Sequence, residues 1–194
     1  VFVRNAGDWS QQAYLKASNS DAEDRFGWSV SICDDTIVAG AIYECSNATG
    51  INGNQSNNSA SASGAAYVFT RTGSVWSQQA YLKSSNSNAG DIFGVSVSLS
   101  GDRLVVGAEG EDSDATGVYG DPADNSEGSS GAAYLFSRFD GVWTEQAYIK
   151  ATNTDGRTWD VYGDHFSVGL QLSGNTVVIG SYLEDSAATG INGD

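Results

Sequence analysis

The residues best suited to chemistry in this chain are carboxylates gathered in one long polar segment. Residues 111–131 read EDSDATGVYGDPADNSEGSSG and contain Glu111, Asp112, Asp114, Asp121 and Asp124. Calcium prefers flexible loops rich in oxygen ligands, so these five side chains are candidate ligands for Ca²⁺. An earlier segment of similar sequence, residues 44–64, has Asn or Cys in place of nearly every carboxylate. The alternative is therefore an acidic surface that serves solubility alone.

A second set of candidate residues is a tyrosine and a lysine two positions apart, found three times. Side chains alternate along a strand, so each pair shares one strand face. In one interpretation the tyrosine is packed and the lysine stem lies along apolar surface. In the other, the pairs form a surface stripe that binds glycans or a neighbouring subunit. The pairs are Tyr14 with Lys16, Tyr81 with Lys83, and Tyr148 with Lys150.

Composition argues against several classes of function. The formal net charge is -15, from 24 acidic and 9 basic residues, which disfavours nucleic acid as a partner. No apolar run approaches the roughly 20 residues that span a bilayer, so we expect no membrane insertion. The single histidine, His165, has no nucleophile motif around it. Catalysis would have to use carboxylates alone, and we expect no enzyme.

The elements that position these residues come from an internal repeat. Trp9, Trp76 and Trp143 are 67 residues apart and open the strings WSQQAYLKASN, WSQQAYLKSSN and WTEQAYIKATN. A period of this kind indicates a repeat architecture. We divide the chain into units of residues 1–63, 64–130 and 131–194, the first truncated at its head and the last in its loop.

Each unit is expected to supply four short strands and a polar loop. In the second unit the strands are residues 65–71, 78–83, 93–98 and 105–108, and the last two read as a hairpin. An aspartate precedes the third strand in every copy, at Asp24, Asp91 and Asp164, where it could accept backbone N–H bonds and pin a corner. A four-stranded sheet needs cover on both faces, which neighbouring copies provide.

Two cysteines occur in the first copy alone. Cys33 stands where the other copies have Ser100 and Ser173, and Cys45 stands where they have Asp112 and Asp185. Their joint appearance favours a disulfide between strand end and loop over two unrelated thiols.

The first long loop also contains three N-x-S/T sequons, at Asn47, Asn54 and Asn57. In a glycosylating host these are candidate glycan sites. The alternative is that Asn and Ser are simply abundant there.

The third and fourth strands resemble the FG-GAP repeat, the blade of integrin α-subunit propellers and of many secreted bacterial proteins. The resemblance rests on Phe26-Gly27, Gly40-Ala41, Phe93-Gly94 and Gly107-Ala108, and the third copy departs at Ser167 and Ser181. It implies an all-β fold of tandem four-stranded antiparallel blades of a β-propeller. Three blades do not close a ring, since propellers typically have about four to eight. We therefore expect part of a larger propeller or array.

The resemblance implies a role outside the cell or on its surface. The leading expectation is a non-enzymatic FG-GAP module for adhesion or for binding a protein or glycan. The alternative is a structural subunit of an extracellular filament, sheath or appendage, in which the partners are further copies of the chain. A propeller that supports a hydrolase elsewhere on a parent chain also stays open. Integrin-like blades often carry a calcium loop between the FG and GAP strands, but here those turns read only SICDDT, SLSGDR and QLSGNT.

Overall fold

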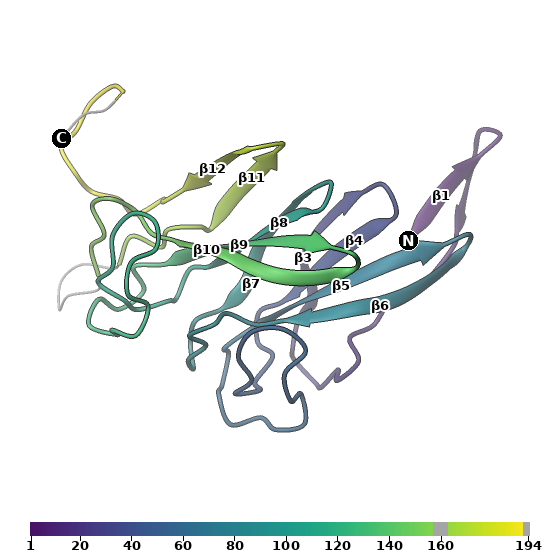
Figure 1. Ribbon diagram of the computed structural model, residues 1–194, viewed down its shortest axis with the longest axis horizontal. Helices are drawn as coiled ribbons and strands as arrows, with labels where there is room; N and C mark the ends of the chain where they lie inside the picture. The colour runs from purple at the N-terminus through teal and green to yellow at the C-terminus, as the bar shows by residue number, and fades with distance from the viewer. Residues whose placement is uncertain (157–162, 192–194) are drawn as a thin grey trace.

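The chain forms strands and loops throughout residues 1–156 and 163–191, which the structure, a computed structural model, describes. Two four-stranded antiparallel sheets stand in a row, with a two-stranded hairpin at either end (Figure 1). Within these residues there is no helix long and apolar enough to cross a membrane. The expected all-β class and the tandem four-stranded antiparallel blades are confirmed.

The strands follow the chain in simple order. The first sheet contains β3 (Phe26–Cys33), β4 (Thr36–Ala41), β5 (Ala65–Thr72) and β6 (Val75–Leu82). The second contains β7 (Phe93–Ser100), β8 (Arg103–Ala108), β9 (Ala132–Phe139) and β10 (Val142–Ile149). The end hairpins are β1 (Phe2–Asn5) with β2 (Asp8–Gln11), and β11 (Gly169–Ser173) with β12 (Thr176–Gly180).

Each sheet joins hairpins from two different sequence units. The boundary expected between residues 63 and 64 falls inside the first sheet, and that between 130 and 131 falls inside the second. The cause is the pairing of β4 with β5, which runs without a break from Thr36 opposite Thr70 to Ala41 opposite Ala65. The long loops therefore connect neighbouring strands of one sheet, and the short segment after β6 leads to the next sheet.

One face of β7 is apolar and forms the core between the two sheets. Phe93, Val97 and Leu99 are buried in one cluster with Val38 of β4 and Val68 of β5. Burial of this surface, at roughly 25 cal/mol per Å², is the main force that holds neighbouring sheets together. β7 is thus the strand through which the second sheet packs on the first.

The opposite face of β7, and the same face of β3, carry serine hydroxyl groups that bond to the next sheet. Ser31 Oγ of β3 accepts a hydrogen bond from the Leu99 backbone N at 3.0 Å, and Ser98 Oγ of β7 accepts one from the Leu172 N at 2.9 Å. A side chain thus satisfies a backbone donor that the sheet itself leaves free. The alternation of apolar residue and serine in FGxSVS is therefore a two-faced packing pattern.

The glycine of the VVGA run allows the backbones of adjacent sheets to approach closely. A Cβ added at Gly40 would collide with the carbonyl oxygen of Gly94, and one added at Gly107 would lie 2.5 Å from the carbonyl oxygen of Ser167. Gly94 itself has φ +92°, a conformation that favours glycine. The FG and GAP glycines therefore meet across the boundary between two blades.

The aspartate before each FG strand pins a corner, as expected. Asp24 Oδ2 accepts from the Asp21 N at 2.8 Å, Asp91 Oδ2 from the Asn88 N at 2.7 Å, and Asp164 Oδ2 from the Asp155 N at 3.1 Å. All three aspartates are buried. The bond fixes the turn through which the chain enters the next sheet.

Candidate functional site

The repeated lysine lies in a buried polar cage under each long loop. Lys83 follows β6, and its Nζ donates to Glu44 Oε2 at 3.0 Å, to Ser63 Oγ at 2.6 Å and to the Ser46 carbonyl oxygen at 3.0 Å. The lysine and the glutamate have no appreciable exposed surface. All three ammonium protons are thereby satisfied without water.

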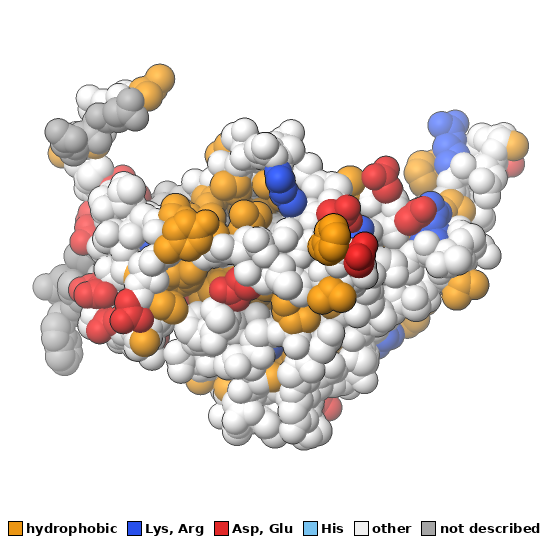
Figure 2. Space-filling view, viewed as in Figure 1, with side chains coloured by type: hydrophobic (Ala, Val, Ile, Leu, Met, Phe, Trp, Pro, Cys, Tyr) orange, Lys and Arg blue, Asp and Glu red, His pale blue; other side chains and the backbone are white. Residues whose placement is uncertain are grey.

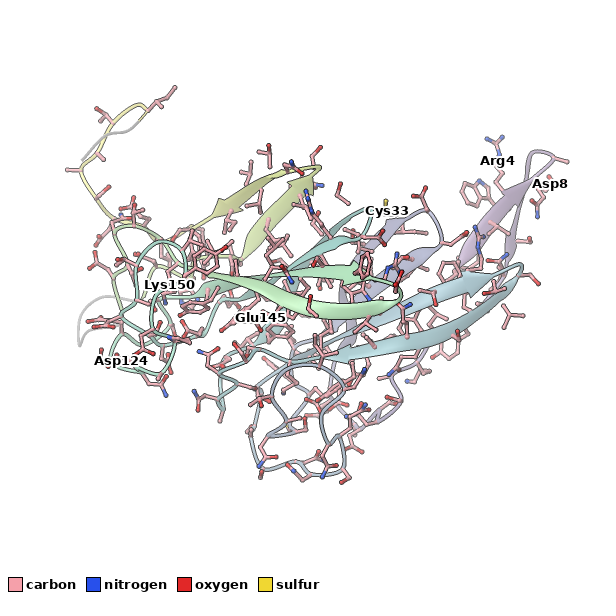
Figure 3. The ribbon with its side chains drawn as sticks, in the orientation of Figure 1. Arg4, Asp8, Cys33, Asp124, Glu145 and Lys150 are labelled. Atoms are coloured by element: carbon pink, nitrogen blue, oxygen red, sulfur yellow. The ribbon has the colours of Figure 1, made fainter. Side chains whose placement is uncertain are left out.

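The second blade repeats this cage. Lys150 Nζ lies 2.8 Å from Glu111 Oε2 and 2.5 Å from Ser130 Oγ, again out of contact with solvent. Figure 3 shows Lys150 at the end of β10 that is nearest the loop bearing Asp124. The ion pair ties the loop that follows β8 to the outermost strand of the same sheet.

The tyrosines of the repeat complete the cage. Tyr148 Oη donates to Glu111 Oε1 at 2.8 Å, and Asn86 Nδ2 donates to the same oxygen at 2.9 Å. Tyr134 Oη donates to Asn86 Oδ1 at 2.6 Å. Burial raises the pKa of the Tyr134 and Tyr148 hydroxyls, and the Glu111 charge adds to the shift.

These surroundings correct the interpretation of the tyrosine and lysine pairs as a binding stripe. Tyr81, Lys83, Tyr148 and Lys150 are buried and cannot touch a partner. Burial lowers the pKa of both lysines, against the opposite pull of the glutamates. The packed-tyrosine interpretation was right for the ring but wrong for the lysine, whose ammonium is enclosed as well.

The first pair differs from the other two. Tyr14 is 79% exposed and Lys16 is exposed beside it. Its strand also ends early, at Gln11: β1 begins at Phe2, the equivalent of Phe69, whereas β5 pairs with β6 from Ala66 onward.

The five candidate calcium ligands do not converge. Glu111 belongs to the buried ion pair, Asp112 Oδ1 accepts from the Ser129 N at 2.7 Å, and Asp114 is exposed. In residues 1–156 and 163–191, no three His, Cys, Asp or Glu side chains are grouped so that they could hold a metal ion. The expected Ca²⁺ site is thus not formed by these residues.

Asp121 and Asp124 serve the loop's own turns. Asp121 Oδ1 accepts from the Ala123 N at 2.9 Å, and Asp124 Oδ1 accepts from the Ser126 N at 2.8 Å. Asn54 and Asn57 make the same bonds in the first loop, to the Ser56 N at 3.0 Å and the Ser59 N at 3.3 Å. Such turns need a side-chain oxygen two residues before the amide, which Asn and Asp supply equally well. The acidic and the amide-rich loops therefore share one backbone design.

The sequons lie in this first loop, and their glycosylation stays a prediction. Asn47 and Asn54 are exposed, whereas Asn57 is half-buried and donates through Nδ2 to Asn47 Oδ1 at 2.6 Å. A glycan on Asn57 would replace one of the two Nδ2 protons and would have to fit beside Asn47. The two loops differ in surface charge. The first loop, lowest in Figure 2, is almost uncharged, whereas exposed acidic side chains lie on the second loop, at the left of the view.

The expected disulfide is not formed, and both cysteines are free thiols. Cys33 ends β3 at the hairpin turn (Figure 3), and Cys45 lies past the other end of β4. The six residues of β4 alone extend roughly 20 Å, whereas disulfide Cα atoms lie within about 7 Å. The fact that both cysteines occur in the first copy alone said nothing about the distance between them.

Sequence reasoning missed Tyr119 in the acidic loop. Its side chain is 75% exposed and its φ is +64°, a left-handed conformation that is unusual for a bulky residue. The equivalent residue of the first loop is Asn52, at φ +56°. The asparagine of the string GING is replaced by a tyrosine in the equivalent string GVYG, and this exchange was a visible signal.

Sheets stacked in tandem, and packed so closely that Gly40 of the first meets Gly94 of the second and Gly107 of the second meets Ser167 at the third, define a repeat protein built of propeller blades. The sequence model of the FG-GAP repeat matches residues 9–69 and 76–136. The chain therefore belongs to the FG-GAP repeat family. No curated protein matches the sequence.

Proposed function

We propose that this chain is a non-enzymatic adhesion module of the cell surface or extracellular space, and that its acidic loop binds a protein or glycan partner. The observation that carries the proposal is the exposed ring of Tyr119 on a left-handed backbone. FG-GAP repeats occur in extracellular and adhesive proteins, which agrees with this role.

Folding gives no reason for a tyrosine at this position. A non-glycine residue in the left-handed region costs on the order of 1 kcal/mol, and asparagine tolerates that region better than an aromatic residue does. Asn52 shows that the loop backbone forms with asparagine. A destabilising residue with an exposed aromatic ring points to selection for contact.

The loop backbone that carries this ring is held in place before any partner arrives. The Tyr119 N donates to the Tyr148 carbonyl oxygen at 3.0 Å, and Gly117 exchanges backbone bonds with Ala151 and Lys150 at 3.1 and 2.7 Å. Exposed carboxylates of Asp114 and Asp121 flank the ring in sequence. A rigid loop loses little conformational entropy on binding, and rings beside carboxylates suit sugar hydroxyls or basic protein surfaces.

The test compares wild type with Tyr119→Asn, which installs the residue of the first loop. Binding is measured on a glycan array and on a panel of purified extracellular-matrix proteins. We expect saturable binding by wild type and at least a tenfold loss in the variant, which should fold at least as stably. Phe139→Asn, which removes another exposed aromatic side chain at the β9–β10 turn, is the control. Equal binding by wild type and Tyr119→Asn would refute the assignment of the loop.

A further inference from the structure

A single buried carboxylate bridges two side-chain nitrogen atoms in the second blade. Glu111 Oε2 accepts a hydrogen bond from Lys150 Nζ at 2.8 Å, and Glu111 Oε1 accepts one from Asn86 Nδ2 at 2.9 Å. The lysine and the glutamate are shut off from solvent, and Asn86 is half-buried. An amine, which can attack a carbonyl carbon, therefore lies beside a carboxamide, which contains one, with a proton carrier between them.

The carboxamide of Asn86 is fixed and polarised by its other contacts. Tyr134, which is fully buried, donates from Oη to Asn86 Oδ1 at 2.6 Å. Asn86 Nδ2 also donates to the Pro122 carbonyl oxygen at 3.0 Å. A donor aimed at a carbonyl oxygen stabilises the negative charge that develops there when a nucleophile adds to the carbon.

The first blade contains the same group of residues. Glu44 Oε2 accepts from Lys83 Nζ at 3.0 Å, and Glu44 Oε1 accepts from Asn19 Nδ2 at 2.9 Å. Tyr67 Oη donates to Asn19 Oδ1 at 2.6 Å. The two long loops differ in charge, yet both blades keep this arrangement. An ion pair alone would need neither the carboxamide nor the hydroxyl group that polarises it.

We propose that each group forms an amide bond between its lysine and its asparagine, with the glutamate as the proton carrier. In the second blade Lys150 Nζ attacks Asn86 Cγ, the Cγ–Nδ2 bond breaks, and ammonia leaves. In the first blade Lys83 joins Asn19 in the same way.

The protons of this reaction are exchanged within the group. Lys150 Nζ first passes one proton to Glu111, which leaves a neutral amine with a free electron pair. Burial favours the neutral amine, because it lowers the pKa of Lys150 against the opposite pull of Glu111. When the Nζ–Cγ bond has formed, Glu111 gives its proton to Nδ2 and takes a second one from Nζ. The ammonia then collects that proton from Glu111, so a lysine ammonium and a carboxamide become a secondary amide and an ammonium ion.

The surroundings allow this reaction in the folded chain alone. The lysine and asparagine are brought together only by folding, which replaces an encounter between distant residues with a step inside one group. Exclusion of water from Lys150 and Glu111 removes the competing nucleophile. Nζ must also leave Ser130 Oγ before it can reach Cγ. The folded chain therefore exists first with the ion pair and acquires the amide bond afterwards.

Each bond would enclose a whole blade. Asn86 precedes β7 and Lys150 follows β10, so all four strands of the second sheet lie between them. Asn19 and Lys83 enclose the first sheet in the same way. A pull along the chain would pass through the side-chain bond and bypass the strands. Closure of so long a loop also restricts the unfolded chain, as a disulfide does.

The intact mass of the denatured chain tests the proposal. Chain produced in a host that does not glycosylate should become lighter than its sequence mass of 20.2 kDa by two ammonia molecules. The loss should grow with time in the folded chain and should not occur in chain kept unfolded in urea. A folded chain that stays at the sequence mass through prolonged incubation would overturn the proposal.

A substitution of the proton carrier tests the role of the carboxylate. Glu111→Gln keeps an acceptor but cannot relay protons, so this variant should lose one ammonia molecule, from the first blade alone. Asp114→Asn, which makes the same change at an exposed site of the same loop, is the control and should lose two. Loss of two ammonia molecules by Glu111→Gln would refute the assigned chemistry.

Peptide mapping separates this bond from another reaction that releases ammonia. An asparagine can cyclise on its own backbone, and Asn52, which precedes Gly53, has a suitable sequence. The proposed bond gives a branched peptide in which the segments of Asn86 and Lys150 stay joined, and trypsin should not cut after Lys150. Ammonia loss found only in linear peptides, with normal cleavage after Lys150, would overturn the proposal.

Discussion

Lys150 Nζ lies 2.8 Å from Glu111 Oε2, with both side chains sealed from solvent. The glutamate follows the second strand of its sheet and the lysine follows the fourth, so the pair spans the sheet end beneath the long loop. Lys83 and Glu44 repeat the relationship at 3.0 Å. A charged pair of this kind is costly to break, because the remaining charge stays buried. The loop and the outer strand should consequently unfold together.

Lys150→Met should destabilise the chain by about 3–5 kcal/mol, because the substitution leaves Glu111 buried without its counter-charge. The measurement is equilibrium urea unfolding, followed by tryptophan fluorescence. Combining Lys150→Met with Glu111→Gln removes both charges and keeps an acceptor for Tyr148 and Asn86. The double variant should regain much of the loss. Equal stability of Lys150→Met and wild type would show that the ion pair is not what fixes the loop.

Asp91 should make the chain less stable as the pH rises from about 4 to about 7. Burial, helped by the charges of Glu111 and Asp112, raises the pKa of this carboxyl to about 7, against the Asn88 N–H bond that favours the charged form. The unfolded chain releases the same proton near pH 4. Between these values the folded state binds more protons, so this contribution is fully present below pH 4 and is lost as the pH passes 7.

Asp91→Asn isolates the effect, since an amide oxygen still accepts from the Asn88 N and does not titrate. Relative to this variant, the free energy of unfolding of the wild type should fall with pH by at most about 1.4 kcal/mol per unit. Urea unfolding of both proteins at several pH values between 4 and 8 measures the difference. A constant difference across that range would mean that Asp91 is ionised throughout.

Much of the fold could be predicted from the sequence because repeats expose periodicity. The 67-residue spacing, the alternating FGxSVS run and the β-branched VVGA run specify strands and hairpins from local information. The sequence alone could not show which two hairpins belong to the same sheet. A repeat has the same sequence wherever its unit is cut, and only the pairing of Ala41 with Ala65 across a long loop decides which hairpins share a sheet.

The candidate site was harder to predict, because burial depends on the neighbouring strands. Lys150 reads as a surface residue by type, since lysine is almost never buried unless it is paired. Its partner is 39 residues away, in a segment where four other carboxylates suggested calcium instead. The sequence shows the exchange of Asn52 for Tyr119 between the two loops, but only the structure shows that Tyr119 is exposed and has a left-handed backbone.

Gly107→Ala should force β8 away from Ser167, which precedes β11 in the next sheet. The added Cβ would lie 2.5 Å from both the Ser167 carbonyl oxygen and Ser96 Oγ. Overpacking against backbone costs about 1–3 kcal/mol, and the thermal midpoint should fall accordingly. Gly169→Ala is the matched control, because its Cβ meets nothing within 4 Å and its φ needs no glycine. Comparable losses in the two variants would point to strand propensity and not to the contact between blades.

Cys33 should tolerate serine but not valine, because its sulfur acts as a hydrogen-bond acceptor between blades. Cys33 Sγ accepts from the Gly101 N at 3.3 Å, and Ser100 Oγ accepts from the Gly174 N at 2.9 Å at the next junction. Cys33→Ser should therefore change stability by less than about 0.5 kcal/mol, whereas Cys33→Val removes the acceptor of the Gly101 N–H and should cost about 1 kcal/mol, the net worth of one hydrogen bond. Alkylation of the unreduced, unfolded wild-type chain should label both thiols. A chain that takes up no label would restore the disulfide and remove the acceptor role argued for Cys33.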